Sequence, residues 1–166
     1  MLNRIIFISN SVPKSGSTLL FNLQKEFLYS FCENAADESE IESILDNNGV
    51  AHQRDFILRP HHENFRKALV SDVFSNGPYV FKTHTPINGE FRKIFLEHDH
   101  MFASLIIRDP IDVFLSARDN YKQTGEFPEF EDFDKGVEIV CDFFETIHRS
   151  TLNTRYKKTI PIIRYK

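Results

Sequence analysis

The feature that most constrains the fold of this chain is a local pattern that occurs twice: an apolar run, a short polar turn and the start of an amphipathic segment. The apolar run 5–8 leads into the polar turn 13–18, and the apolar run 105–107 leads into the turn 108–110. A buried strand that passes through such a turn into a helix presents backbone N–H groups and a positive helix end to an anion. Two of these turns, about ninety residues apart, predict a ligand with two separate phosphate-like groups.

Apolar periodicity predicts an α/β fold. Continuous apolar runs indicate buried strands, and apolar residues at three- and four-residue spacing indicate helices. The predicted strands cover residues 4–9, 79–81, 101–107 and 160–164, a turn covers 76–78, and the predicted helices cover 17–31, 38–46, 61–75, 89–97, a segment that follows Asp109, and 131–149. Alternating strands and helices imply a three-layer sandwich with a central parallel sheet, whose ligands bind beyond the carboxyl ends of the strands.

Length and composition limit the possible classes of protein. The 166 residues suit a single domain over 1–166. The formal charge of −4 argues against a nucleic-acid partner, so an anion site must be a local cluster of Lys and Arg. No apolar run approaches the length that spans a membrane, which predicts no membrane partner. Cys32 and Cys141 fit no C-x-x-C pattern, which indicates two reduced, buried thiols in a cytoplasmic protein.

The first polar cluster, 13–18, has the composition of a phosphate-binding loop without being a Walker A loop. A Walker A loop ends in Gly-Lys-Ser/Thr, whereas Lys14 here precedes Gly16. Gly16 lets the backbone approach an anion, Ser17 and Thr18 supply hydroxyl groups, and Lys14 supplies positive charge. A serine-capped helix with an exposed lysine explains the same residues without a ligand.

The second cluster is Lys82-Thr83-His84. Alternation along an extended segment puts Lys82 and His84 on the same side. A histidine whose pKa is near about 6.5 accepts a proton at neutral pH, and the charge of Lys82 favours the neutral imidazole. The alternative is a surface lysine and a loop histidine before Pro86.

The third cluster runs from Arg108 to Ser116. If Asp109 caps the helix, Asp112 and Ser116 lie on its face. Arg108 and Ser116 can then hold one phosphate, because arginine is the preferred residue for forked phosphate contacts. Two alternatives remain: the acidic residues are simple cap and first-turn charges, or 105–109 imitates a Walker B strand with a metal-binding aspartate.

Two histidine pairs raise the question of a metal site. The pairs are His61-His62 and His98-x-His100. Neither has a third ligand at a suitable spacing, and surface histidines are common. We therefore predict no metal site.

The three clusters, in this order, resemble the sulfotransferase family that uses 3′-phosphoadenosine 5′-phosphosulfate (PAPS). The turn 13–18 is similar to the 5′-phosphosulfate loop of that family, Lys82-Thr83-His84-x-Pro86 to its catalytic Lys-x-His segment, and 108–116 to its 3′-phosphate motif. Residues 160–165 are similar to the strand that ends in a tyrosine near the adenine. The resemblance implies a P-loop NTPase-like sulfotransferase fold and transfer of a sulfonyl group from PAPS to a hydroxyl or amine. The acceptor would be a small molecule or a glycan, and no metal is needed.

The resemblance also implies a role for each matched residue. His84 takes the proton from the acceptor, Lys82 assists at the sulfonate, and Lys14 stabilises the phosphate leaving group. Arg108 and Ser116 hold the 3′-phosphate of PAPS and of its product, adenosine 3′,5′-bisphosphate (PAP). The residues expected to bind the cofactor are Lys14, Ser15, Gly16, Ser17, Thr18, Arg108, Ser116 and Tyr165.

The chain departs from the family at two places. Leu19 stands where cytosolic members usually carry a tryptophan, and the sequence stops at Lys166, where family members continue with a further contact to the 3′-phosphate. This predicts either a cofactor pocket that is half open or a chain truncated at its C-terminus. A PAPS- or PAP-binding protein without catalysis and an ATP-dependent small-molecule kinase are the alternatives. The segments 33–76 and 120–135 are expected to line the acceptor pocket.

Overall fold

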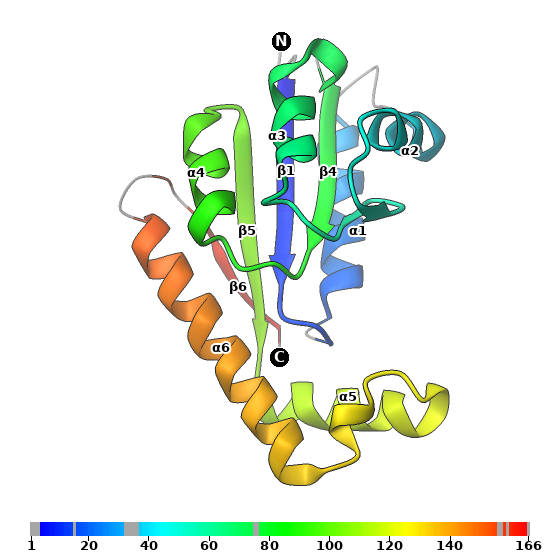
Figure 1. Ribbon diagram of the computed structural model, residues 1–166, viewed down its shortest axis with the longest axis vertical. Helices are drawn as coiled ribbons and strands as arrows, with labels where there is room; N and C mark the ends of the chain where they lie inside the picture. Colours follow the sequence, from blue (N-terminus) through cyan, green and yellow to red (C-terminus); the bar gives the residue numbers. More distant parts are fainter. Residues whose placement is uncertain are drawn as a thin grey trace.

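One mostly parallel sheet organises the chain (Figure 1). The computed structural model describes residues 4–14, 16–31, 37–74, 77–155, 158 and 160–165. Within these ranges six strands pair in the order β2-β3-β4-β1-β5-β6. The strands are β1 (Arg4–Ser11), β2 (His52–Gln53), β3 (Phe56–Ile57), β4 (Gly77–Thr83), β5 (Met101–Arg108) and β6 (Ile162–Tyr165). All the pairs are parallel except β2 with β3, which confirms the predicted parallel α/β sheet.

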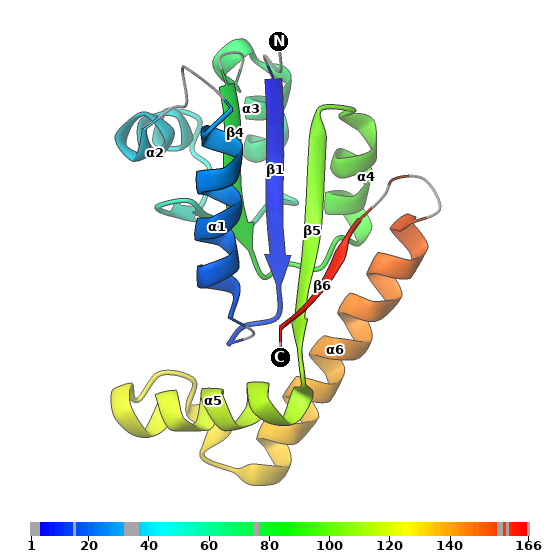
Figure 2. The same cartoon turned by 180° about the vertical axis from the view of Figure 1, so that it is seen from behind.

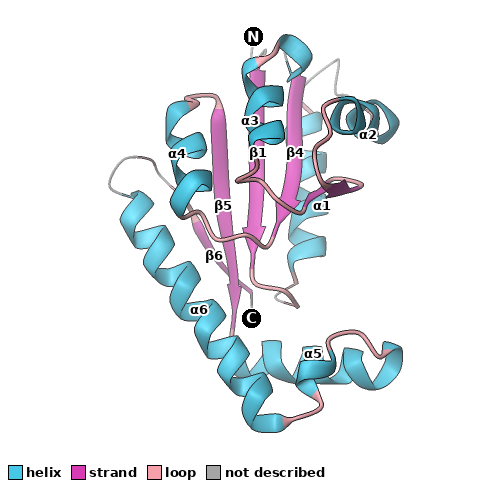
Figure 3. Cartoon of the chain, in the orientation of Figure 1, coloured by secondary structure: helices cyan, strands magenta, loops and turns pink. Residues whose placement is uncertain are grey.

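Helices cover both faces of the sheet (Figure 3). The helices are α1 (Ser17–Tyr29), α2 (Glu38–Asn47), α3 (Glu63–Val70), α4 (Gly89–Glu97), α5 (Pro110–Thr124) and α6 (Phe133–Arg155), with short 3₁₀ turns η1 (Asp72–Phe74) and η2 (Pro128–Phe130). In Figure 1, α3 and α4 lie in front of the sheet, and Figure 2 shows α1 on the opposite face. The helix α5 lies beyond the carboxyl ends of the strands, and α6 runs beside β6. The arrangement is that of a three-layer sandwich.

The register of the sheet brings the three polar clusters to one edge. Asn10 of β1 lies beside Thr83 of β4 on one side and beside Leu105 of β5 on the other. The loop after β1, the segment Lys82–His84 and Arg108 therefore all occur where these strands end. The prediction that the clusters meet at the carboxyl edge of the sheet is confirmed.

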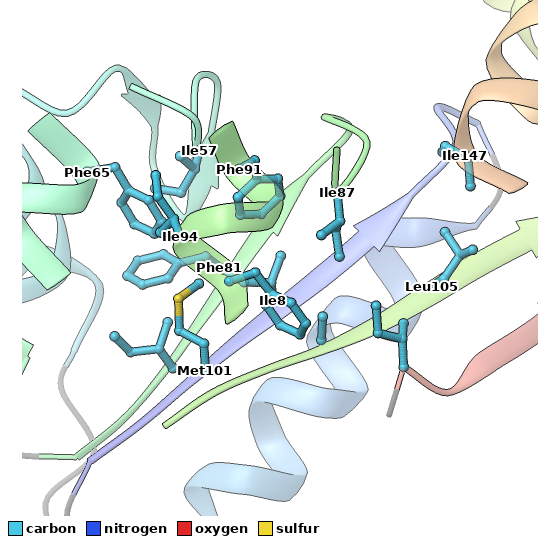
Figure 4. Packing of buried hydrophobic residues seen from close by; sticks show 14 of the residues in the cluster. Ile8, Ile57, Phe65, Phe81, Ile87, Phe91, Ile94, Met101, Leu105 and Ile147 are labelled. Atoms are coloured by element: carbon cyan, nitrogen blue, oxygen red, sulfur yellow. The ribbon is translucent and has the colours of Figure 1, made fainter. Parts of the chain in front are cut away.

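The main core lies between the sheet and the helices α3, α4 and α6. Alternate strand residues point into it, and they pack against aromatic and aliphatic residues of the helices (Figure 4). The strand residues of this core include Ile6, Ile8, Tyr79, Phe81, Met101, Ala103 and Leu105. The other face of the sheet is more polar: Lys82 bonds to Thr18 of α1, and the hydroxyl of Ser104 accepts a hydrogen bond from Gln24 of α1 at 2.8 Å.

The helix α1 is correctly predicted, but its apolar stripe does not face the core. Of the apolar residues at three- and four-residue spacing, Leu20 and Leu28 are half-buried, but Leu19, Leu23 and Phe27 are exposed, as is Phe31 just beyond the helix. Phe21, outside this stripe, is buried. Gln24 and Lys25 instead face the protein, because their polar groups bond to Ser104 and Asp55. The spacing of apolar residues located the helix, and hydrogen bonds to the polar face of the sheet determine which side of the helix packs against the protein.

Other expectations from the sequence are corrected. The turn predicted at 76–78 is wrong at Gly77, where β4 begins, and the helix predicted over 61–75 is divided into α3 and η1. The short hairpin β2–β3 was not predicted. Cys141 is exposed rather than buried, and Cys32 lies outside the described residues. Among the residues that the structure describes, none of the helices has the length and apolar character needed to cross a bilayer.

A buried ion pair ties the hairpin to α1. Lys25 Nζ lies 2.8 Å from a carboxylate oxygen of Asp55, in the hairpin turn, and 2.8 Å from Glu38 of α2. The side chains of Lys25 and Asp55 are 11% and 9% exposed. Burial lowers the pKa of Lys25, but the hydrogen bonds to Asp55 and Glu38 outweigh it and raise the pKa above its ordinary value. The backbone carbonyl of Asp55 also accepts a hydrogen bond from the N–H of Lys82 at 2.9 Å, so this pair supports the hairpin beside β4.

We expect Lys25→Met to lower the free energy of unfolding by about 3 kcal/mol, because it leaves the buried carboxylate of Asp55 without its partner. The double variant Lys25→Met/Asp55→Leu should lose less than the single one. Urea denaturation at pH 7 measures both. Lys93→Met, which removes the exposed pair with Glu90, is the control and should change stability by less than about 1 kcal/mol. Equal losses in Lys25→Met and Lys93→Met would contradict a structural role for the buried pair.

Candidate active site

The loop after β1 leads into a helix whose start is capped by none of the side chains that the structure describes. Gly16 precedes α1 with a φ of 79°, in the left-handed region that favours glycine. The helices α2 and α5 begin differently, since the carboxylates of Asp37 and Asp109 accept hydrogen bonds from N–H groups of their first turns. Within the described residues, no side chain makes such a cap for α1. Its first-turn N–H groups are therefore suited to an external anion.

A cavity of about 400 Å³ lies between this loop and α5. Figure 2 shows α5 beyond the end of β1, with the loop between them. The residues that line the cavity are Lys14, Arg108, Asp112, Leu115, Ser116, Asp119, Asn120 and Gln123. Lys14 from the first anion signature and Arg108 with Ser116 from the second thus share one cavity.

The two anion signatures differ in which groups they present. The carboxylate of Asp109 accepts a hydrogen bond from Ile111 N at 2.8 Å and so occupies the start of α5. The carboxylate thus occupies an N–H group that the sequence predicts to face an anion, and the expectation that Asp109 caps this helix is confirmed. Arg108 Nε lies 3.3 Å from Asp112 Oδ2, an ion pair between the end of β5 and the first turn of α5. The capping bond also explains Asp109 without a metal, against the Walker B interpretation.

His84 is held in one tautomer by the end of β1. Its Nδ1 lies 2.9 Å from the backbone carbonyl oxygen of Ser11 and 3.0 Å from the hydroxyl of the same residue. Because a carbonyl oxygen can only accept, Nδ1 carries the proton and Nε2 carries the lone pair. The ring of Phe56 packs edge-on against the imidazole, with the ring centres 4.9 Å apart. Nε2 is thus the basic nitrogen of a fixed ring.

The environment of His84 keeps the imidazole neutral. The pKa of His84 is lowered to about 4, mainly by burial and less by the charges of Lys82 and Lys14, while the hydrogen bond to Ser11 acts in the opposite direction. The sequence predicted a neutral imidazole because of the charge of Lys82. The structure supports that effect but makes burial the main cause. At neutral pH the ring is a proton acceptor.

Lys82 lies beside the start of α1. Its ammonium donates a hydrogen bond to the hydroxyl of Thr18 at 2.9 Å and lies 5.9 Å from the centre of the Phe56 ring. Burial and the positive charge of Lys14 lower the pKa of Lys82. Lys82 contacts the start of α1, His84 contacts the end of β1, and both lie near the Phe56 ring, which agrees with the prediction that they point to the same side.

The structure gathers the predicted residues into two adjoining groups. Lys14, Arg108 and Ser116 line the cavity, whereas Lys82 and His84 do not. The charge of Lys14 acts on both members of the second group, so the loop after β1 lies between the two. Ser15 is outside the described residues. For Ser17 and Tyr165 the structure describes the backbone alone, and Tyr165 pairs with Arg108 in the register of β5 and β6.

Sequence reasoning missed residues that hold the site in place. Ser11 fixes His84, and the amide of Asn10 donates a hydrogen bond to the carbonyl of Thr85 at 2.9 Å. Their signal was present as the small polar run Ser9-Asn10-Ser11 at the end of an otherwise apolar strand. Phe56 had no such signal beyond being an aromatic residue in a predicted pocket segment, because a hairpin of two-residue strands has no readable period.

The histidine pairs considered as metal ligands have other surroundings. His61 and His62 are exposed, and His62 caps α3 by accepting a hydrogen bond from Asn64 N at 3.3 Å. The rings of His98 and His100 pack against each other, with centres 5.3 Å apart. Across the part of the chain that the structure describes, no three or more His, Cys, Asp and Glu side chains converge as a metal site would need.

The chain was also compared with known proteins. It matches no family model, and no curated protein is similar to it at a significant level.

We expect Phe56→Ala to raise the pKa of His84 well above about 4, because it admits water to the imidazole. Lys82→Met should raise it less, since burial has a larger effect than the charge of Lys82. NMR titration of the imidazole signals measures both shifts. Phe27→Ala, at an exposed aromatic residue of α1, is the matched control. A pKa near 6.5 in the unmodified chain would contradict the buried environment.

The same pKa predicts how stability changes with pH. The unfolded chain binds a proton at His84 near the ordinary pKa of 6.5, and the folded chain near about 4. The free energy of unfolding should therefore fall as pH falls from about 6.5 towards 4. In His84→Asn this part of the pH dependence should be missing. Denaturation of both chains at pH 7 and pH 4.5 gives the comparison, and identical slopes would contradict the assignment.

Proposed function

We propose that this protein is a PAPS-dependent sulfotransferase, as its three motifs suggest. The observation that supports the proposal most directly is the shared cavity, which Lys14 lines from the loop after β1 and Arg108 and Ser116 line from β5 and α5. A ligand with phosphate groups at two positions needs cations at two positions, whereas a triphosphate needs them at one. The uncapped start of α1 supplies further N–H donors beside Lys14.

PAPS, when bound, supplies an activated sulfonyl group whose S–O bond to the 5′-phosphate breaks during transfer. Around it, Lys14 and the first turn of α1 would hold the 5′ end, and Arg108 with Ser116 the 3′-phosphate. Arg108 is oriented for this by its ion pair with Asp112. The donor is thereby fixed at both ends, which favours in-line attack.

His84 would act on the acceptor. Its Nε2 carries a lone pair at neutral pH, because Nδ1 donates to Ser11 and burial lowers the pKa of the ring to about 4. When the acceptor oxygen or nitrogen bonds to sulfur, its proton passes to Nε2. The products are the sulfonated acceptor and PAP.

Two cations would stabilise the charge that moves during the transfer. Lys82, beside Thr18 at the start of α1, would contact the sulfonate. Lys14 would stabilise the negative charge that develops on the departing phosphate oxygen. The proposal thus gives a separate function to each of three basic residues: Lys14, Lys82 and His84.

We expect PAP to bind and Arg108→Ala to weaken its binding by about tenfold or more, since a charge-assisted contact to the 3′-phosphate is lost. Isothermal titration calorimetry measures the affinity. Lys122→Ala removes one charge from an exposed position of the same helix and should bind PAP like the unmodified chain. Absence of binding at millimolar PAP would exclude the proposal, and binding unaffected by Arg108→Ala would exclude the assigned 3′-phosphate site.

Catalysis is tested by transfer of radiolabelled sulfonyl from PAPS to a panel of phenols, alcohols, amines and glycans. We expect transfer to one class of acceptor and a loss of at least about a hundredfold in His84→Ala. PAP binding without transfer to any acceptor would favour a binding protein without catalysis. Stabilisation by ATP with Mg²⁺ but not by PAP would favour a kinase.

A further inference from the structure

The Lys14 side chain is held by the far end of α5. Its ammonium donates a hydrogen bond to Asn120 Oδ1 at 2.7 Å and lies 5.7 Å from the centre of the Phe127 ring. Asn120 is one turn beyond Ser116, and Phe127 follows the end of α5. Both contacts join segments more than a hundred residues apart in sequence, and neither residue has a role in the function proposed above.

The amide of Asn120 is oriented by its neighbours. Its Nδ2 lies 3.1 Å from Thr124 Oγ1 and 3.2 Å from a carboxylate oxygen of Glu126. A carboxylate can only accept, so the nitrogen points to Glu126 and the amide oxygen points to Lys14. The amide is therefore locked with its acceptor directed at the ammonium.

The backbone is unusual at both ends of this contact. Lys14 has a φ of 62° and Phe127 a φ of 63°. Among the described residues other than glycine, these two and Arg54 have positive φ. The left-handed region is unfavourable for a residue with a β-carbon, and such residues concentrate at functional sites. Phe127 is also 41% exposed, so burial in the core does not account for its conformation.

We infer that Asn120 and Phe127 are positioning residues that hold the Lys14 ammonium at the cavity shared with Arg108 and Ser116. The inference rests on the proposed function, because it assigns Lys14 to an anionic ligand. It also implies that the distance between the two anion sites is fixed by the contacts of Lys14 with Asn120 and Phe127, which join the loop after β1 to α5. The loop alone would leave the long lysine side chain free among many rotamers.

The use of an amide rather than a carboxylate at position 120 matters for this role. An amide oxygen holds the ammonium by one hydrogen bond and leaves its full positive charge for a ligand. A carboxylate would hold it as well but would neutralise that charge. Asp119 and Asp112 also line the cavity, so a third carboxylate would oppose the binding of phosphate groups.

The matched variants Asn120→Leu and Asn120→Asp separate these two effects. How firmly the Lys14 ammonium is held is measured by the rate at which Lys14 is reductively dimethylated. Mass spectrometry gives this rate relative to that of Lys122, an exposed lysine of α5. We expect Lys14 to react about tenfold faster in Asn120→Leu and no faster than in the unmodified chain in Asn120→Asp. An unchanged rate in Asn120→Leu overturns the inference. If that variant fails to fold, Phe127→Leu takes its place, with faster labelling again expected and an unchanged rate again overturning it.

Binding and kinetics give the second measurement. With PAP, both Asn120→Leu and Asn120→Asp should bind about tenfold more weakly, although only Asn120→Leu frees the lysine. In transfer assays, KM for PAPS should rise in both variants, while KM for the acceptor should not. If Lys14 labelling changes as expected but the unmodified chain binds no PAP, the positioning role stands and the proposed ligand falls. If PAP binds and labelling is unchanged, the proposed function stands and the positioning role falls.

Discussion

The candidate site depends on the parallel pairing of β1 with both β4 and β5. Because all three strands end at the same edge, Ser11, His84 and Arg108 come together although they are far apart in sequence. The register is as important as the direction. Thr83 is buried and donates a hydrogen bond to the carbonyl of Ile57. A slip of β4 by one residue would turn Lys82 towards the core and Thr83 towards the site.

Much of this frame could be predicted from the sequence, because it follows from local chemistry. Apolar runs located the central strands, and Asp109 with Pro110 correctly indicated the start of α5. The hairpin β2–β3 could not be predicted, since its strands have two residues each and no period. Likewise, the exposed face of α1 was unpredictable from Leu19 and Phe27, because the polar partners that fix its rotation come from distant strands.

The same division applies to the candidate site. Its basic residues could be identified from the sequence, because Lys14, His84 and Arg108 follow strands in recognisable patterns. The orientation of their side chains could not be predicted in this way. The tautomer of His84 depends on a backbone carbonyl of Ser11, and the orientation of Lys14 depends on Asn120, more than a hundred residues away. Contacts of this kind exist only once the tertiary structure has formed.

The loop after β1 also shows how a binding site limits the stability of its own scaffold. The helices α2 and α5 are stabilised at their starts by aspartate caps, and each such cap contributes about 1 kcal/mol. The helix α1 has Gly16 at this position, in a left-handed conformation, and among the described residues no side chain caps it. The residues that cap helices have extended backbone, so the loop would have to leave this conformation to gain a cap, and the cap would then occupy the N–H groups suited to an anion. The left-handed conformation at Gly16 therefore leaves these N–H groups open and forgoes the stability that a cap gives to α2 and α5, so stability and ligand binding compete over the conformation of this loop.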